Sequence, residues 1–132
     1  MMNRPLSLLF ASQLLLLAGP LLAEEAYVVR TFRKIVLTTT FYAEGSGYGD
    51  FNKDGKMDAV YGPHWYEGPD FQNKHALYPV KAFEPKGYSN NFITMVNDVN
   101  SDGYDDILVN ERPGKAVHWF ENPEGKTDAP WK

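Results

Sequence analysis

Two nine-residue segments with the same spacing of acidic and amide side chains constrain this chain more than any other feature. They are residues 50–58, D-F-N-K-D-G-K-M-D, and residues 98–106, D-V-N-S-D-G-Y-D-D. In each segment an oxygen-bearing side chain stands at the first, third, fifth and ninth positions, and glycine stands at the sixth. Ca²⁺ takes about six to eight oxygen ligands of these kinds, and glycine permits the sharp turn that such a loop needs. The pattern therefore predicts two calcium loops.

The predicted ligands form one set in each loop. In the first loop they are the side chains of Asp50, Asn52, Asp54 and Asp58 and the backbone carbonyl of Lys56. In the second loop they are the side chains of Asp98, Asn100, Asp102 and Asp106 and the backbone carbonyl of Tyr104. Asp, Asn and Gly are also common in ordinary turns, but the match at every liganding position favours a metal. We therefore expect about two Ca²⁺ per chain.

The residues after each loop exclude an EF-hand. That motif needs a glutamate at its twelfth position and flanking helices, whereas the twelfth positions here are Tyr61 and Val109. Residues 59–61 and 107–109 are short apolar runs that contain β-branched and aromatic side chains. Such runs favour strands. We expect each loop to lead into a strand, which also argues against a dockerin.

Residues 1–23 are predicted to be a secretory signal peptide. Arg4 supplies a positive charge, residues 6–17 are mostly apolar, and Ala23 offers a small residue for cleavage. The alternative is a membrane anchor, but the apolar core is short for a span of about 20 residues. We therefore expect a secreted or periplasmic chain that begins at Glu24 and has no membrane span after cleavage.

Composition limits the partners and the means of stabilisation. The formal net charge is −4, and much of the acidity lies in the two loops. The sequence has no basic stripe, so nucleic acid is not an expected partner. It also has no cysteine, so bound metal could supply the constraint that disulfides give to other small exported domains.

Outside the loops the sequence predicts further strands and no helix beyond the signal peptide. Residues 27–42 are rich in β-formers and are expected to form a strand, and a short strand is expected around residues 76–83. A second shared motif follows each loop. It reads H-W-Y-E-G-P at residues 64–69 and H-W-F-E-N-P at residues 118–123. The repeat is therefore larger than the loop, with the loops 48 residues apart and the tryptophans of the motif 54 apart.

These two motifs resemble FG-GAP/VCBS repeats, in which each blade of an integrin-like β-propeller carries a calcium loop. The resemblance covers about residues 42–123, with one repeat at about 42–91 and another at about 92–132. It implies an all-β fold, a partial β-propeller of about two blades, and calcium ligation by the loop side chains named above. The repeat region as a whole is expected to be residues 24–132. In the second copy Asn97 replaces the glycine that is common before the first aspartate.

Two blades are few for such a fold. Propellers use about four to eight blades, and repeat folds generally need about three units to bury their faces. We expect the chain to be a fragment of a longer protein. The alternatives are an assembly with further blades from other chains and a face-to-face packing of the two units.

The aromatic and histidine residues of the second motif have two interpretations. Trp65, Tyr66, Trp119 and Phe120 could stack on a sugar, but their matching positions in both copies favour packing between blades. His64 and His118 could bind a transition metal, but a structural or hydrogen-bonding role is favoured.

The sequence predicts a secreted calcium-binding repeat module that binds a protein or a carbohydrate, and it offers no candidate catalytic residue. The alternative is the N-terminal part of a propeller-based secreted enzyme of lyase or dehydratase type that acts on carbohydrate.

Overall fold

The computed structural model describes residues 30–132. The predicted signal peptide lies outside the described residues. Residues 34–132 form one compact unit. The fold and the candidate sites described below all belong to this unit.

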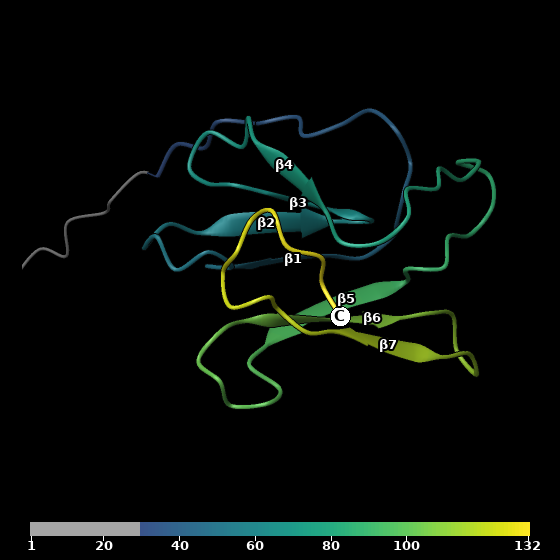
Figure 1. The fold of residues 1–132 in the computed structure, drawn as a ribbon. Coiled ribbons are helices and arrows are strands. Elements are labelled where there is room, and N and C mark those ends of the chain that lie inside the picture. The colour runs from purple at the N-terminus through teal and green to yellow at the C-terminus, as the bar shows by residue number, and fades with distance from the viewer. Residues whose placement is uncertain (1–29) are drawn as a thin grey trace, which may run out of the picture. The chain divides into compact units, whose positions relative to one another are not determined.

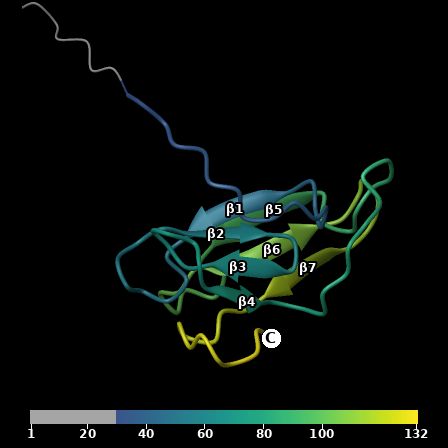
Figure 2. The ribbon, with the colours of Figure 1, turned by 90° about the horizontal axis from the view of Figure 1, so that it is seen from above.

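This unit contains two antiparallel sheets, which lie one over the other (Figures 1 and 2). The first has the order β1-β2-β3-β4, with bounds Ser46–Gly49, Asp58–Tyr61, His64–Tyr66 and Lys74–Ala76. The second has the order β5-β6-β7, with bounds Ile93–Asn97, Asp106–Asn110 and Val117–Phe120. Residues 30–132 contain no helix, so the all-β prediction is confirmed.

The two sheets repeat one connection. Each predicted calcium loop joins the first two strands of its sheet, from β1 to β2 and from β5 to β6. The register is equivalent, since Gly49 pairs with Asp58 and Asn97 pairs with Asp106. The histidine-tryptophan motifs form the third strands, β3 and β7. The strands expected directly after the loops are therefore confirmed.

Two strand predictions are wrong. Residues 30–42, the described part of the expected strand 27–42, contain no strand. Their β-formers find no neighbouring strand, and Phe32 remains 92% exposed; β-propensity without a pairing partner does not make a strand. The strand expected around 76–83 lies earlier, at Lys74–Ala76.

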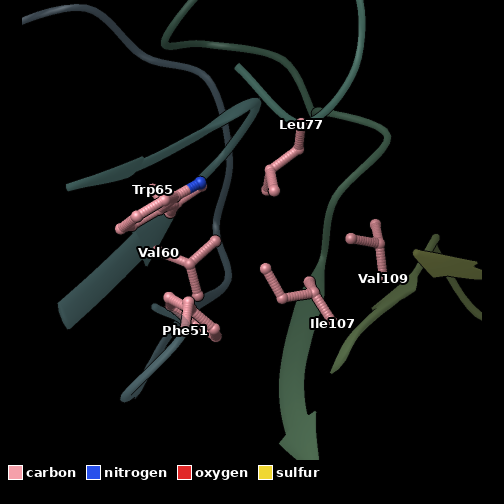
Figure 3. Packing of buried hydrophobic residues seen from close by; sticks show 6 residues of the cluster. All are labelled: Phe51, Val60, Trp65, Leu77, Ile107 and Val109. Atoms are coloured by element: carbon pink, nitrogen blue, oxygen red, sulfur yellow. The ribbon is translucent and has the colours of Figure 1, made fainter. Parts of the chain in front are cut away.

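The core lies between the two sheets. Phe51, Val60, Trp65 and Leu77 come from the first repeat, and Ile107 and Val109 come from the second (Figure 3). Complete burial of a side chain such as that of Ile107 contributes about 1.5–3 kcal/mol. Neither sheet could bury this surface alone, so the two repeats form one core.

Glycine lets β1 lie close against β5. A Cβ atom at Gly45 would stand 2.5 Å from the backbone nitrogen of Thr94, and one at Gly47 would stand 2.9 Å from Val96. The segment before the first loop is rich in glycine, a residue that is uncommon in strands. The glycines in and beside β1 permit this close packing.

Candidate metal-binding loops

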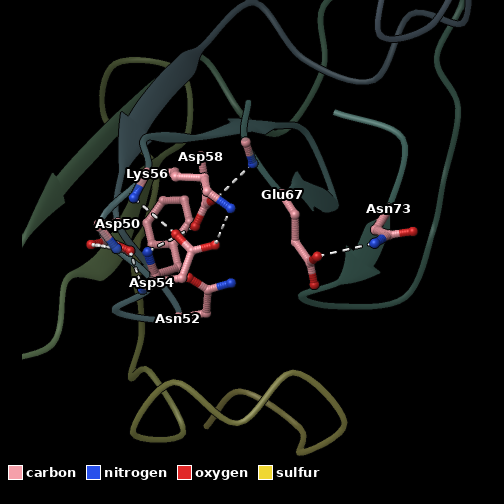
Figure 4. Close-up of polar contacts among 10 residues, drawn as sticks. Asp50, Asn52, Asp54, Lys56, Asp58, Glu67 and Asn73 are labelled. Atoms are coloured by element: carbon pink, nitrogen blue, oxygen red, sulfur yellow. Dashed lines mark hydrogen bonds and ion pairs between the residues drawn. The ribbon is translucent and has the colours of Figure 1, made fainter. Parts of the chain in front are cut away.

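The first loop is organised by its own side chains, which bind backbone N–H groups further along the turn (Figure 4). Asp50 accepts from the N–H of Asp54 at 3.1 Å and from that of Gly55 at 3.0 Å. Asn52 Oδ1 also accepts from the N–H of Asp54 at 3.1 Å, and Asp54 accepts from that of Lys56 at 2.8 Å. These bonds place the oxygens of three predicted ligands around one turn.

The second loop has the same four bonds at the same positions. Asp98 accepts from the N–H of Asp102 at 3.1 Å and from that of Gly103 at 2.9 Å. Asn100 Oδ1 accepts from Asp102 at 3.0 Å, and Asp102 accepts from Tyr104 at 2.8 Å. The bond from the backbone of Tyr104, followed by one from the side chain of Asn100, lowers the pKa of Asp102. These two hydrogen bonds therefore favour the ionised form of its carboxylate.

The ninth residue of the first loop has a different environment. Asp58 is 1% exposed, and its two oxygens accept from the N–H of Phe51 at 2.9 Å and of Gly68 at 2.8 Å. Burial raises the pKa of Asp58, and the negative charges of Asp54 and Asp50 raise it further. The hydrogen bonds from Gly68 and Phe51 lower this pKa but do not cancel the increase. The charges of Asp50 and Asp54 thus disfavour the ionised form of Asp58.

Asp106 repeats this arrangement in the second loop. Its carboxylate is completely buried and accepts from the N–H of Val99 at 3.1 Å and of Asn122 at 2.8 Å. The side chain of Asn122 also donates to the carbonyl oxygens of Phe51 at 3.0 Å and Asp105 at 2.9 Å. In both repeats the ninth residue therefore ties its loop to the turn after the third strand.

The donor set suits a hard cation. All the predicted side-chain ligands offer oxygen, which Ca²⁺ prefers. A carboxylate oxygen that accepts one N–H keeps a second lone pair, so the observed bonds leave room for ligation. Among the residues that the structure describes, however, no three His, Cys, Asp or Glu side chains form a cluster that could hold a metal. Any site would therefore draw on asparagine and backbone oxygens as well.

The two residues predicted to offer carbonyl ligands bind the fifth residue of their own loop through their N–H groups. The N–H groups of Lys56 and Tyr104 bind Asp54 and Asp102, respectively. The ammonium group of Lys56 also lies 3.6 Å from the carboxylate of Asp54. Because both groups are substantially exposed, this pair contributes little to stability.

The loops are neighbours in space. The N–H of Asp50 lies 3.4 Å from a carboxylate oxygen of Asp105, which follows the second loop's turn. The ammonium group of Lys53 lies 5.8 Å from the centre of the Tyr104 ring. The acidic residues of both loops therefore gather at one end of the stacked sheets.

The aromatic residues of the repeated motif differ between the copies. Trp65 and Tyr66 are buried, as the packing interpretation expects. Phe120 is half-buried and stacks on Tyr78 with ring centres 4.9 Å apart. Trp119 is 45% exposed and lies outside the core, so packing within this chain does not account for it.

The histidines of this motif also lie in unequal surroundings. His64 is buried, and its Nδ1 has no hydrogen-bond partner. His118 is exposed, and its Nε2 lies 3.0 Å from Glu111. The structural and hydrogen-bonding interpretation agrees with these environments.

Sequence reasoning missed the donors that hold the ninth aspartates. No role is predicted for Gly68 or Asn122, yet their backbone N–H groups bind Asp58 and Asp106. The signal was the G-P and N-P pair that ends each repeated motif. Sequence reasoning also missed the contact of His75 with Glu67, whose side chains lie 2.7 Å apart.

Comparison with protein-family models, with curated proteins and with solved structures finds no match. Within residues 30–132, no helix has the length and apolar character that crossing a membrane requires.

Proposed function

We propose that this chain is a secreted or periplasmic binding module of β-propeller repeat type, with two blade-like units that each hold one Ca²⁺. The observation that carries the proposal is the equivalence of the two loops. Four side-chain-to-backbone bonds recur at the same positions in both, 48 residues apart. Two unrelated turns would not be expected to share all four of these hydrogen bonds.

The chain's own residues give calcium a structural role. Asp50, Asn52 and Asp54 would supply side-chain oxygens from one turn, and Asp58 would link them to the sheet through its bonds to the backbone. The second set would act alike through Asp106. When bound, Ca²⁺ supplies positive charge that offsets the repulsion among these carboxylates.

The proposed partners are a protein or a carbohydrate. Further blades would be the simplest partners to cover the exposed face of the second sheet. The face of the second sheet away from the core presents Ile93, Met95 and Trp119, which are 45–48% exposed. Exposed apolar groups gathered on one face often mark an interaction site. This face corresponds to the face of the first sheet that carries Trp65.

A second candidate function is an enzyme that acts on carbohydrate, and one observation favours it. A cavity of about 260 Å³ is lined by aromatic side chains together with Glu111 and His118. These two side chains lie 3.0 Å apart, within the reach required of an acid–base pair. Loss of a lyase activity on substituting either residue, with the fold intact, would favour the enzyme.

Calcium titration of the chain by calorimetry tests the proposed function. We expect about two sites with dissociation constants of about 10⁻⁴ to 10⁻³ M, as in extracellular calcium modules. Asp54→Ala and Asp102→Ala should each remove or weaken one site. Asp70→Ala is the matched control, because Asp70 is an exposed turn aspartate that binds the N–H of Gln72 outside either loop. Absence of heat at millimolar calcium, or equal effects of all three variants, would contradict the proposal.

A further inference from the structure

The cavity lined by Glu111 and His118 lies between the two repeats. Tyr42 and Pro63 of the first repeat and His118 and Phe120 of the second contribute to its lining. Pro63 follows the end of β2 and Glu111 follows the end of β6, whereas the predicted calcium loops precede these strands. The cavity is therefore at the opposite end of the sheets from the loops, and calcium is not expected in any contact made there.

A difference between the repeats creates the polar side of this cavity. Strands β2 and β3 are joined by residues 62–63, and His64, directly after them, is buried. Strands β6 and β7 are joined by the longer segment 111–116, which places the side chain of Glu111 beside that of His118. The backbone N–H of Glu111 donates to a carbonyl of the same segment at 3.0 Å. The second repeat thus adds a carboxylate that the first repeat lacks, and it holds the backbone of that residue in place.

Aromatic rings form the apolar part of the lining, and their own contacts hold them in place. Tyr78 stacks on Phe120 with ring centres 4.9 Å apart, and its hydroxyl group accepts from the side chain of Asn91 at 3.2 Å. The N–H of Phe83 donates to the carbonyl of Phe41 at 2.9 Å, which holds this ring's segment against the chain before β1. The lining is therefore already formed, as small-molecule sites usually are.

The polar groups of the lining include both acceptors and donors of hydrogen bonds. The contact of His118 with Glu111 uses one carboxylate oxygen, Oε1, at 3.0 Å, and the second oxygen can accept another bond. The ammonium group of Lys81 lies 5.1 Å from the centre of the Phe83 ring, and among the described residues it forms no ion pair with a carboxylate. The side-chain amide of Asn90 offers groups of both kinds.

This combination matches a sugar ring in size and in chemistry. The volume of about 260 Å³ is below the range of about 300–1,000 Å³ for drug-sized ligands, so the cavity suits one small ring. Aromatic faces provide the apolar surface on which the C–H face of a pyranose packs, and sugar hydroxyl groups both donate and accept hydrogen bonds. A purely apolar ligand would leave the second oxygen of Glu111 and the ammonium group of Lys81 without partners, which is costly.

We infer that this cavity is a non-catalytic site for one pyranose unit of a carbohydrate. The ring packs on the aromatic lining, Glu111 accepts a hydrogen bond from one hydroxyl group, and Lys81 donates to another. The cavity holds one ring, whereas a lyase must hold the two rings that its bond joins. This inference rests on the proposed role as a binding module, for which it names the ligand class and the site, but it requires no calcium in the contact.

Ligand-detected NMR with the full chain and a panel of simple sugars tests the inference. The probes are the methyl pyranosides of glucose, galactose and mannose, together with glucuronic acid. At least one should show saturable magnetisation transfer from the protein, strongest at its ring C–H protons because these face the aromatic lining. Glu111→Ala should weaken binding of that sugar by about tenfold or more, the cost of losing a hydrogen bond to a charged group. Lys81→Ala should also weaken it.

Glu124→Ala and Tyr48→Ala are the matched controls, and both should leave the affinity unchanged. Glu124 is an exposed glutamate that pairs with Lys126, and Tyr48 is a 74% exposed aromatic residue of the first sheet. Neither lines the cavity. Near-ultraviolet circular dichroism checks that each variant is folded. Lys81→Ala alters only an exposed side chain, so it decides the matter even where Glu111→Ala does not fold.

Three results would overturn the inference. One is the absence of saturable binding by every sugar of the panel. Another is binding that is indifferent to both Glu111→Ala and Lys81→Ala, which would place the sugar elsewhere. The third is cleavage of an oligosaccharide that Glu111→Ala abolishes, which would make the cavity an active site. Calcium titration by calorimetry is read separately, and Glu111→Ala should leave it unchanged, so failure of the calcium sites and failure of the sugar site give different results.

Discussion

The carboxylate of Asp58 accepts a hydrogen bond from the backbone N–H of Gly68 at 2.8 Å, with both residues buried. The same carboxylate caps the N–H of Phe51 inside the loop. One side chain therefore joins the loop to the turn that ends β3. A residue expected from its spacing to be a metal ligand is also a structural anchor.

Replacing this carboxylate should destabilise the fold even without metal. Asp58→Asn keeps one oxygen for two buried N–H donors, so one donor loses its partner. We expect the free energy of unfolding to fall by about 1–3 kcal/mol, since relief of the buried charge offsets only part of the loss. Urea unfolding in the presence of a chelator measures this. Asp70→Asn, at an exposed turn, should cost much less, and equal effects would argue against the anchoring role.

Calcium removal should lower stability further. A ligand present at about tenfold over its dissociation constant stabilises the folded state by about 1.4 kcal/mol per site, or about 3 kcal/mol for two sites. We expect chelation to lower the melting temperature clearly. Mg²⁺ should restore little, because it holds its waters and requires a tight octahedral shell. A melting curve that ignores both chelator and calcium would refute the stabilising role.

Acid should weaken the fold through His64. Burial lowers the pKa of His64 below its ordinary value of 6.5, and the charge of Lys74 lowers it further. Below pH 6.5 the unfolded chain therefore binds more protons than the folded chain, so stability is full above this pH and declines as the pH falls through the folded pKa. His64→Phe should flatten the pH dependence of the free energy of unfolding below pH 6.5. His118→Phe, at an exposed position, should retain the slope.

The close approach of the sheets should make Gly45 sensitive to a single methyl group. An added Cβ would stand 2.5 Å from a backbone nitrogen of Thr94, and backbone cannot move aside as a flexible side chain can. We expect Gly45→Ala to lower the free energy of unfolding by about 1–3 kcal/mol, the usual cost of overpacking. Gly87→Ala is the control, since its Cβ would meet only Glu84 O, at 3.5 Å. Equal denaturation midpoints for the two variants would contradict this packing argument.

Much of the local structure follows from the sequence because short-range chemistry determines it. The Asp-Asn-Asp-Gly spacing creates bonds between residues two to five apart, such as those of Asp50 to Asp54 and Gly55. The apolar residues after each loop then continue as β2 and β6. The position of the loops and the repeat of the third strand were therefore predictable.

The remaining features depend on contacts that no local pattern contains. Strand β1 consists largely of poor β-formers, and its glycines make sense only against β5. The bonds of Asp106 to Asn122 span 16 residues. Trp65 and Trp119 occupy equivalent positions, yet one is buried and the other is 45% exposed. Their burial differs because another part of the chain packs over Trp65 and none packs over Trp119 to the same extent.

The bond from Asn122 to the carbonyl of Phe51 reaches across 71 residues, and Trp131 packs edge-on against the ring of Phe51 with centres 5.8 Å apart. The end of the second repeat thus completes the burial of the first. Neither repeat can melt without exposing the other's core, so unfolding should be cooperative, with no populated half-folded intermediate. A chain that ended before residue 122 would lose more stability than the missing residues' own contacts supply. Ribosomal synthesis must also reach residue 131 before the core around Phe51 is complete.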